Sequence, residues 1–206
     1  MFLNRKEAGK KLAKAIKDLK LDIYPQDTVI LALPRGGVVI GCEVAKVLHV
    51  QLGILVTRKI GAQFNPEYAI AAVSEHAFVA GLETEGAKEY LKAETKKERQ
   101  EIVRRLKEYK INKLNLNNKT ILLVDDGLAT GLTMQVAIME VKLSRPKRII
   151  VAVPVASLSA LEIIKKHVDM VVCLTATDMF LGIGDFYQDF TQVNDEEVKK
   201  MLEYFY

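Results

Sequence analysis

The stretch Thr120-Ile-Leu-Leu-Val-Asp-Asp-Gly-Leu-Ala-Thr-Gly-Leu-Thr133 decides the fold of this chain. Residues 120–124 are β-prone and almost wholly apolar, which is typical of a strand buried on both faces of a parallel sheet. Two carboxylates, Asp125 and Asp126, follow where the strand should end, and a helix-like stretch at 133–143 comes next. In an open α/β sheet, ligands bind beyond the carboxyl ends of the strands. The stretch therefore predicts a ligand site at a strand-to-helix turn.

The chemistry of this turn suits a ligand with vicinal hydroxyls next to a phosphate. A helix N-terminus offers unpaired N–H groups and a positive dipole end to an anion. Glycines let the backbone approach phosphate oxygens, hydroxyls add donors, and carboxylates accept hydrogen bonds from ribose hydroxyls. The alternative is an ordinary turn with solvated acids, since the spacing is neither a Walker A loop nor Gly-x-Gly-x-x-Gly. The expected phosphate-binding residues are Gly127, Leu128, Ala129, Thr130, Gly131 and Thr133.

An apolar strand, two acids and Thr-Gly-x-Thr at the start of a helix resemble the signature of the type I phosphoribosyltransferases. These proteins bind 5-phosphoribosyl pyrophosphate (PRPP) with this loop. Two-component receiver domains also have an apolar strand that ends in two acids, but they require a phospho-accepting Asp at the end of a later strand. The candidate strand at 169–175 has Cys173 and Leu174 at that position, and a long stretch precedes the acidic strand. The receiver interpretation is therefore set aside.

A second strand-to-helix turn, Leu31-Ala-Leu-Pro-Arg-Gly-Gly37, follows the apolar stretch that begins at residue 28. Gly36 and Gly37 have no side chains to cover the backbone N–H groups, and the Arg35 guanidinium offers several N–H donors to phosphate oxygens. A tight turn with a surface arginine is the alternative. Beside the acidic loop, the motif resembles the pyrophosphate-binding loop of the same family. At a third strand end, we expect Lys59 rather than Arg58 to face the crevice, because adjacent strand side chains point in opposite directions.

The resemblance runs essentially from end to end of the chain. It extends to a group of phosphoribosyltransferases whose acceptor is unassigned. The stretches that carry it are Phe2-x-x-Arg5-x-x-Ala8-Gly9-x-x-Leu12, Arg58-Lys59-Ile60-Gly61, Asn65-Pro66-Glu67 and Phe186-Tyr187-x-Asp189-Phe190-x-Gln192-Val193.

The element pattern and the resemblance together predict an α/β fold with an open, mostly parallel twisted sheet flanked by helices. We expect a single domain over residues 1–206, in which 176–206 form a small hood and a C-terminal helix. Residues 60–66 are expected to form a loop, in the neighbourhood where the family holds a mobile flap over the reacting ribose. Strands are expected at 28–33, 52–58, 69–73, 120–125, 148–154 and 170–175, and helices at 5–20, 37–48, 86–110, 133–143 and 158–167.

The resemblance implies a Mg²⁺-dependent transfer of the phosphoribosyl group of PRPP to a small nitrogenous, base-like acceptor. It implies that Asp125 and Asp126 hold the ribose hydroxyls and the metal, and that Lys59 serves the leaving pyrophosphate. Phe186 and Tyr187 are candidates to stack on the acceptor. Packing of these rings as a lid on the core remains the alternative. A non-catalytic, PRPP-sensing regulator is the alternative function.

Composition narrows the function classes. The 206 residues are 50% hydrophobic and 27% charged, which is ordinary for a globular chain. The net charge of +4 is smaller than a nucleic-acid-binding surface usually requires. The chain shows no apolar run long enough for a bilayer and no signal-peptide core, so a cytoplasmic location is expected. Cys42 and Cys173 stand in apolar contexts and are expected to be buried thiols. We expect a homo-oligomer, with the charged helix at 86–110 as a candidate subunit contact.

Overall fold

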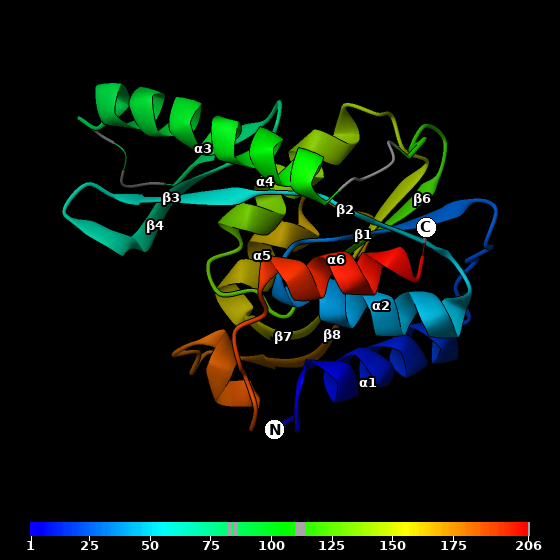
Figure 1. Cartoon of the computed structure of the whole chain (residues 1–206). Helices are drawn as coiled ribbons and strands as arrows, with labels where there is room; N and C mark the ends of the chain where they lie inside the picture. Colours follow the sequence, from blue (N-terminus) through cyan, green and yellow to red (C-terminus); the bar gives the residue numbers. More distant parts are fainter. Residues whose placement is uncertain (82–83, 85, 110–113, 206) are drawn as a thin grey trace.

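A computed structural model describes residues 1–81, 84, 86–109 and 114–205, without the side chain of Glu67. Within these residues, a five-stranded parallel sheet has the order β2-β1-β6-β7-β8, and Figure 1 shows helices on both of its faces. The expected parallel α/β architecture is confirmed. The strands are β1 Thr28–Ala32, β2 Gln51–Ile54, β6 Thr120–Val124, β7 Arg148–Ser157 and β8 Met170–Thr177, and the helices around them are α1 Arg5–Asp18, α2 Gly36–Leu48, α4 Leu132–Lys142, α5 Leu158–Lys165 and α6 Asp195–Glu203.

Alternating strand residues supply the two hydrophobic layers of the main sheet. On β1, Ile30 belongs to the core that also holds residues of α1, α2 and α6, whereas Leu31 belongs to the core under α4 and α5. The same alternation holds on β6, where Leu122 and Leu123 face opposite layers. Both faces of the central strands are therefore buried, which explains why their sequences are continuous apolar runs.

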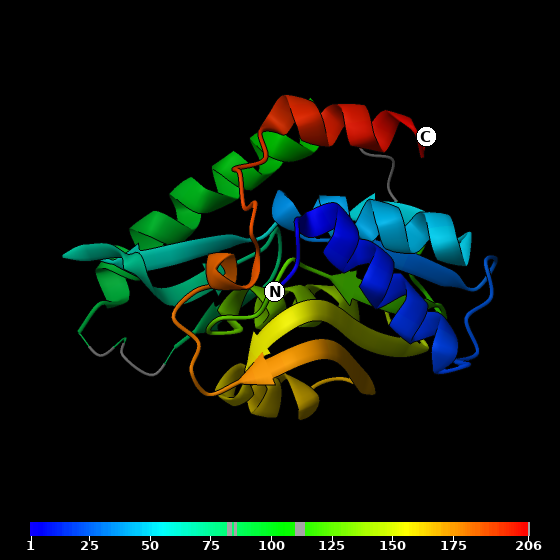
Figure 2. The same ribbon diagram turned by 90° about the horizontal axis from the view of Figure 1, so that it is seen from below.

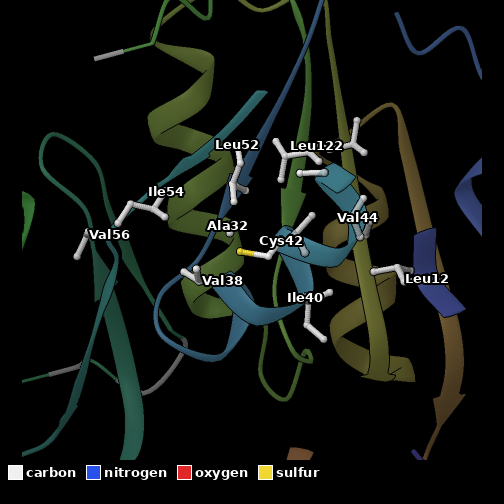
Figure 3. Close-up of a cluster of buried hydrophobic side chains, with 14 of the residues drawn as sticks. Leu12, Ala32, Val38, Ile40, Cys42, Val44, Leu52, Ile54, Val56 and Leu122 are labelled. Carbon is white, nitrogen blue, oxygen red and sulfur yellow. The ribbon is translucent and has the colours of Figure 1, made fainter. Parts of the chain in front are cut away.

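Helix α2 packs its apolar side against the middle of the main sheet. Figure 3 shows Val38 and Cys42 beside Ala32 and Leu52. Burial raises the pKa of the Cys42 thiol to about 12, so this cysteine is neutral at physiological pH. The expectation of a second buried thiol needs correction, because Cys173 lies near the edge of its core and is only half-buried.

A small antiparallel sheet projects beyond the main sheet (Figure 1). Within the described residues it has three strands, β3 Arg58–Ala62, β4 Asn65–Val73 and β5 Phe78–Ala80, and the helix α3 Lys88–Glu108 packs on it. The expected strand at 52–58 is wrong, because β2 ends at Ile54 and β3 begins at Arg58 in the other sheet. The apolar run continues through this break because Leu55 and Val56 are buried where the chain crosses between the sheets. Residue 110, the expected end of the helix, lies outside the described residues.

The expected loop at 60–66 is also wrong, since these residues form the turn and the adjoining strand ends of a β-hairpin. Strands β3 and β4 pair in antiparallel fashion, with register shifts on both sides of Gly61. A Cβ at Gly61 would overlap the Pro66 backbone, so this position requires glycine. The residues that suggested a loop therefore mark an irregularity within a hairpin, which is a common place for glycine and proline in strands.

Helix α4 links the two sheets. Its Leu132 and Val136 form a small core with Ala72 and Ala77 of the antiparallel sheet. The Glu140 carboxylate, near the C-terminal end of α4, accepts hydrogen bonds from the Ser74 hydroxyl at 2.7 Å, from the His76 N–H at 2.9 Å and from the Ala77 N–H at 3.0 Å. The turn between β4 and β5 is thus fastened to the helix that begins at the acidic loop. None of the helices in the described ranges is long and apolar enough to cross a membrane.

Replacing Glu140 with Gln should loosen the antiparallel sheet. Burial alone would raise the pKa of Glu140, but the hydrogen bonds from His76 and Ser74 outweigh it and lower the pKa. The charged form therefore stabilises the fold above the unfolded pKa, and this contribution is lost as the pH falls through the lowered folded pKa. We expect Glu140→Gln to lower the free energy of unfolding at pH 7 by about 1–3 kcal/mol. Urea unfolding at several pH values measures it.

The matched control is Glu94→Gln, because Glu94 pairs with Lys97 along the surface of α3. It should change the free energy of unfolding by less than about 0.5 kcal/mol. Equal effects of the two substitutions would contradict the assigned role of Glu140.

Candidate active site

The two strand-to-helix turns singled out from the sequence lie side by side. Strands β1 and β6 are neighbours in the main sheet, and the pairing continues past β1 because the Leu33 N–H donates to the Val124 carbonyl at 2.9 Å. A Cβ at Gly36 would overlap the Asp126 carboxylate, and one at Gly37 would lie 2.9 Å from the Val124 carbonyl oxygen. The glycine turn is therefore packed directly against the acidic pair.

Helices α2 and α4 both begin at this edge of the sheet, and neither N-cap residue supplies a side-chain cap. At α4, the Leu132 N–H makes a long hydrogen bond of 3.5 Å to the Thr130 hydroxyl oxygen. Other helices differ, since Asn4 caps α1, Ser157 caps α5 and Asn194 caps α6 with side-chain oxygens. Helix α3 has no side-chain cap either, but it begins after β5, away from the main sheet. Uncapped N–H groups and the dipoles of α2 and α4 thus converge on the space beside the acids. This arrangement favours anions.

The loop between the acids and α4 is held in place from the neighbouring strand β7. The Leu128 N–H donates to the Val155 carbonyl at 2.9 Å, and the Ser157 hydroxyl donates to the Ala129 carbonyl at 2.6 Å. Gly131 then turns the chain into α4 with φ +78°, which favours glycine. The backbone of the expected phosphate loop is therefore fixed without a ligand, while Ala129 and the side chain of Thr130 remain exposed.

The two acids have different environments. Asp126 is buried, and its Oδ2 accepts a hydrogen bond from Nε of Arg5 at 2.7 Å. Asp125 is half-buried, and its Oδ1 accepts a hydrogen bond from the Asp126 backbone N–H at 2.8 Å. Burial raises the pKa of the Asp125 carboxyl well above its ordinary value, and the nearby Asp126 charge raises it further. Of the two acids, Asp126 thus forms the ion pair with Arg5.

The opening residues of the chain meet the segment that follows β8, next to the acidic pair. The Phe2 N–H donates to the Phe186 carbonyl at 2.7 Å, and the Gln188 N–H donates back to the Phe2 carbonyl at 2.8 Å. Figure 2 shows the N-terminus beside the segment that follows β8. The Tyr187 hydroxyl donates to the Asp126 carbonyl at 2.7 Å. The opening residues and the segment after β8 therefore pair with each other, and Tyr187 connects this segment to Asp126.

Tyr187 was expected to stack on an acceptor, but it is 5% exposed, and its ring lies against Phe190 and Phe2. This burial corresponds to the lid-packing alternative for that ring. Phe186 is half-buried and stacks on Phe180, with ring centroids 5.1 Å apart. The two hood candidates thus have separate environments.

The candidate cationic residues of the site also differ in their surroundings. Arg58 forms an ion pair with Glu98 of α3 at 2.6 Å, and the next residue, Lys59, is exposed on the strand. Arg35 is half-buried at the start of α2, and its charge acts on the buried Tyr109 of α3. Thr133 is half-buried in the first turn of α4. Within the described residues, no cluster of three or more His, Cys, Asp or Glu side chains could hold a metal by itself.

Comparison with known proteins identifies the relatives of this site. The phosphoribosyl transferase domain matches residues 1–191. The chain belongs to the type I phosphoribosyltransferase family. A solved structure of TT1426 from Thermus thermophilus is 37% identical to it, covers 100% of this chain and 99% of its own, and superposes with a TM-score of 0.82.

Other relatives of this phosphoribosyltransferase domain are more distant or longer. A Mycobacterium tuberculosis protein, provisionally named a phosphoribosyl transferase, is 32% identical over 212 aligned positions, which cover 98% of this chain and 46% of the relative. The chain thus spans about half the length of the curated relatives it matches. The AQ2163 protein from Aquifex aeolicus is 14% identical with a TM-score of 0.58, covers 88% of this chain and 82% of its own, and shares the fold alone.

Within this phosphoribosyltransferase domain, reasoning from the sequence missed Arg5 and Ser157 as contributors to the site. Arg5 stands 121 positions before its partner, and no local pattern predicts such a pair. The signal that could have found it is the position of Arg5 and Phe190 within the opening and closing stretches that carry the family resemblance.

The two acids should respond differently to removal of their charge. Because the pKa of Asp125 is raised in the folded protein, its ionisation reduces stability as the pH rises from the unfolded value of about 3.9 through the folded pKa. Asp125→Asn should therefore raise the free energy of unfolding at pH 7, by up to about 1 kcal/mol. Asp126→Asn should lower it by about 1–3 kcal/mol, because Arg5 loses its carboxylate partner. Urea unfolding without ligand measures both.

The exposed Asp18 provides the control, since Asp18→Asn should leave stability within about 0.5 kcal/mol. If Asp125→Asn and Asp126→Asn lower the free energy of unfolding equally, the environments assigned to the two acids are wrong.

Proposed function

We propose that this chain transfers the 5-phosphoribosyl group of PRPP to a small nitrogenous acceptor and releases pyrophosphate. The observation that carries the proposal is the pair of helix N-termini at α2 and α4, whose N-cap residues supply no side-chain cap, beside the acidic pair on neighbouring strand ends. PRPP has a phosphate at one end, a pyrophosphate at the other and vicinal hydroxyls between them. Two anion sites with carboxylates between them match these groups in kind and in order.

Each turn takes one end of the ligand in this proposal. Residues 127–133, at the start of α4, bind the 5-phosphate through backbone N–H groups and the hydroxyls of Thr130 and Thr133. The Gly36–Gly37 amides and the Arg35 guanidinium bind the pyrophosphate, with Lys59 as a further cation. Asp125 accepts hydrogen bonds from the ribose hydroxyls.

A divalent cation fits this donor set as a companion of the substrate. Mg²⁺ is often held by one or two carboxylates together with phosphate oxygens and water. Asp125 offers a carboxylate beside the proposed pyrophosphate turn, and the described side chains form no cage of three ligands. When bound with PRPP, Mg²⁺ would neutralise charge on the departing pyrophosphate.

The chain supplies catalysis mainly by positioning and by charge in this proposal. The C1–O bond to pyrophosphate breaks, a C1–N bond to the acceptor forms, and the proton of the acceptor nitrogen passes to the departing pyrophosphate. Positive charge develops on the sugar as the first bond lengthens, and the Asp125 carboxylate stabilises it from a site already built around it. The β3–β4 hairpin is the segment that closes over the sugar and excludes water.

The acceptor is a flat nitrogenous heterocycle in this proposal. The stacked rings of Phe180 and Phe186 come from the segment after β8, which also contacts Gly127 through Ile183. The half-buried face of Phe186 is the proposed contact for such an acceptor.

Arg35 should serve the pyrophosphate and not the 5-phosphate, because it belongs to the α2 turn. We expect Arg35→Ala to weaken binding of pyrophosphate and of PRPP with Mg²⁺ at least about tenfold, on the order of 1.4 kcal/mol. Ribose 5-phosphate should lose less than about threefold, which is under 1 kcal/mol. Isothermal titration of each ligand measures the affinities.

Arg148→Ala is the control for that titration, because Arg148 is remote from both turns at the start of β7 and donates to the Asp22 carbonyl. Equal losses for all three ligands in Arg35→Ala would contradict two separate anion sites. A wild-type chain that does not bind PRPP would contradict the proposed function as a whole.

A catalyst and a PRPP-sensing regulator should differ in how the hairpin responds to ligand. In a catalyst, amide hydrogen exchange across residues 60–75 should slow with PRPP and Mg²⁺, and should slow less with ribose 5-phosphate or pyrophosphate alone. A panel of heterocyclic bases should then include one that releases pyrophosphate. Tight PRPP binding, an exchange-labile hairpin and no pyrophosphate release with any base would favour the regulator.

A further inference from the structure

The Arg5 guanidinium is enclosed by contacts from the end of β6 and from the segment after β8. Its Nε donates to Oδ2 of Asp126 at 2.7 Å, and its Nη1 donates to the Thr191 carbonyl at 2.9 Å. Its Cζ lies 3.7 Å from the centroid of the Phe190 ring, so the planar group rests on that ring. The side chains of Arg5 and Asp126 are only 11% and 12% exposed. Moving Arg5 away would leave the buried Asp126 carboxylate without its cationic partner, which is strongly unfavourable.

Asp126 therefore has a fixed cationic partner before any ligand arrives. Its carboxylate also touches the position where a Cβ of Gly36 would lie, and its carbonyl accepts the Tyr187 hydroxyl. Contacts thus hold this residue at its side chain and at its backbone. A carboxylate whose charge is balanced in this way attracts a further cation less strongly than an unbalanced one.

Asp125 differs in each of these respects. Its Oδ1 accepts a hydrogen bond from a neighbouring backbone N–H at 2.8 Å, whereas the Nε of Arg5 donates to the other acid. Its Cα and Oδ1 lie 3.0 Å from the position of a Cβ on Gly37, so it borders the glycine turn directly. Arg5 thus pairs directly with Asp126, and Asp125 is the acid that borders the glycine turn.

We propose that Arg5 is a positioning residue that divides the roles of the two acids. It ties Asp126 into the scaffold and leaves Asp125 as the carboxylate that meets the sugar and a divalent cation. This inference rests on the proposed function, and it departs from the expectation that both acids serve the ligand equally. It also assigns a role at the site to the start of the chain, which lies far from the signature loop in sequence.

Removing the charge of Arg5 should have opposite effects on a bare cation and on PRPP. Without Arg5, two adjacent carboxylates lack a cation, so a divalent ion should bind more tightly. PRPP with Mg²⁺ should bind more weakly, because Asp126 no longer keeps its place beside Gly36. A purely structural loss would weaken both ligands, so the opposite signs distinguish a positioning role from partial unfolding.

The test uses the full chain and isothermal titration with Mn²⁺ alone, then with PRPP and Mg²⁺. We expect Arg5→Gln to raise the Mn²⁺ affinity at least about threefold. It should lower the PRPP affinity at least about tenfold. Arg5→Lys keeps the charge but loses the stacked, two-point contact, so it should raise the Mn²⁺ affinity less than Arg5→Gln does. Arg105→Gln is the control, because Arg105 is similarly enclosed, at 14% exposed, and pairs with Glu101 within α3.

Substitutions of the acids complete the test and remain decisive if Arg5→Gln does not fold. Asp125→Asn should abolish Mn²⁺ binding, whereas Asp126→Asn should keep it within about threefold of wild type. Equal loss of Mn²⁺ in both variants, or unchanged Mn²⁺ affinity in folded Arg5→Gln, would overturn the inference. Failure of wild type to bind PRPP would instead overturn the proposed function. In that case a double-mutant cycle of Arg5 and Asp126 in urea unfolding still tests the pairing, and additive effects would overturn it.

Discussion

The meeting of two strand-to-helix turns depends on the absence of a side chain at Gly36 and Gly37. Both glycines lie so close to the acidic pair that a Cβ would strike Asp126 or the end of β6. Their hydrogen atoms let α2 begin against the neighbouring strand, which brings its uncapped N-terminus close to that of α4. Everything proposed for the site follows from this approach, since it brings two anion-attracting helix ends and two carboxylates into one crevice.

Electrostatics then decides how such a crevice can exist without a ligand. Two adjacent carboxylates at the end of a buried strand repel each other, and burial penalises each charge. The positive charge of Arg5 balances the negative charge of Asp126, while the pKa of Asp125 stays raised. Arg5 therefore stabilises the charge of Asp126, whereas the folded chain disfavours the charge of Asp125. Perturbed pKa values of this kind are common at functional sites.

Much of the main sheet could be predicted from the sequence. Strands buried on both faces are continuous apolar runs, and glycines and acids mark their ends, so the turns at residues 34–37 and 125–131 could be predicted from local chemistry. The hairpin at β3 and β4 could not, because the glycine and proline of a β-bulge have the same local signature as those of a loop. The break after β2 was hidden because Leu55 and Val56 stay buried while they cross between sheets. Arg5 and Tyr187 contact Asp126 from positions far away in the sequence, and such contacts leave no local pattern.

The most direct test of this account is a crystal structure of the full chain with Mg²⁺ and a PRPP analogue that cannot release pyrophosphate. The account predicts the 5-phosphate at the N-terminus of α4, the pyrophosphate at the Gly36–Gly37 amides and the ribose hydroxyls at Asp125, with Arg5 still paired to Asp126. Binding of the analogue elsewhere, or a ribose held by Asp126 with Arg5 displaced, would contradict it.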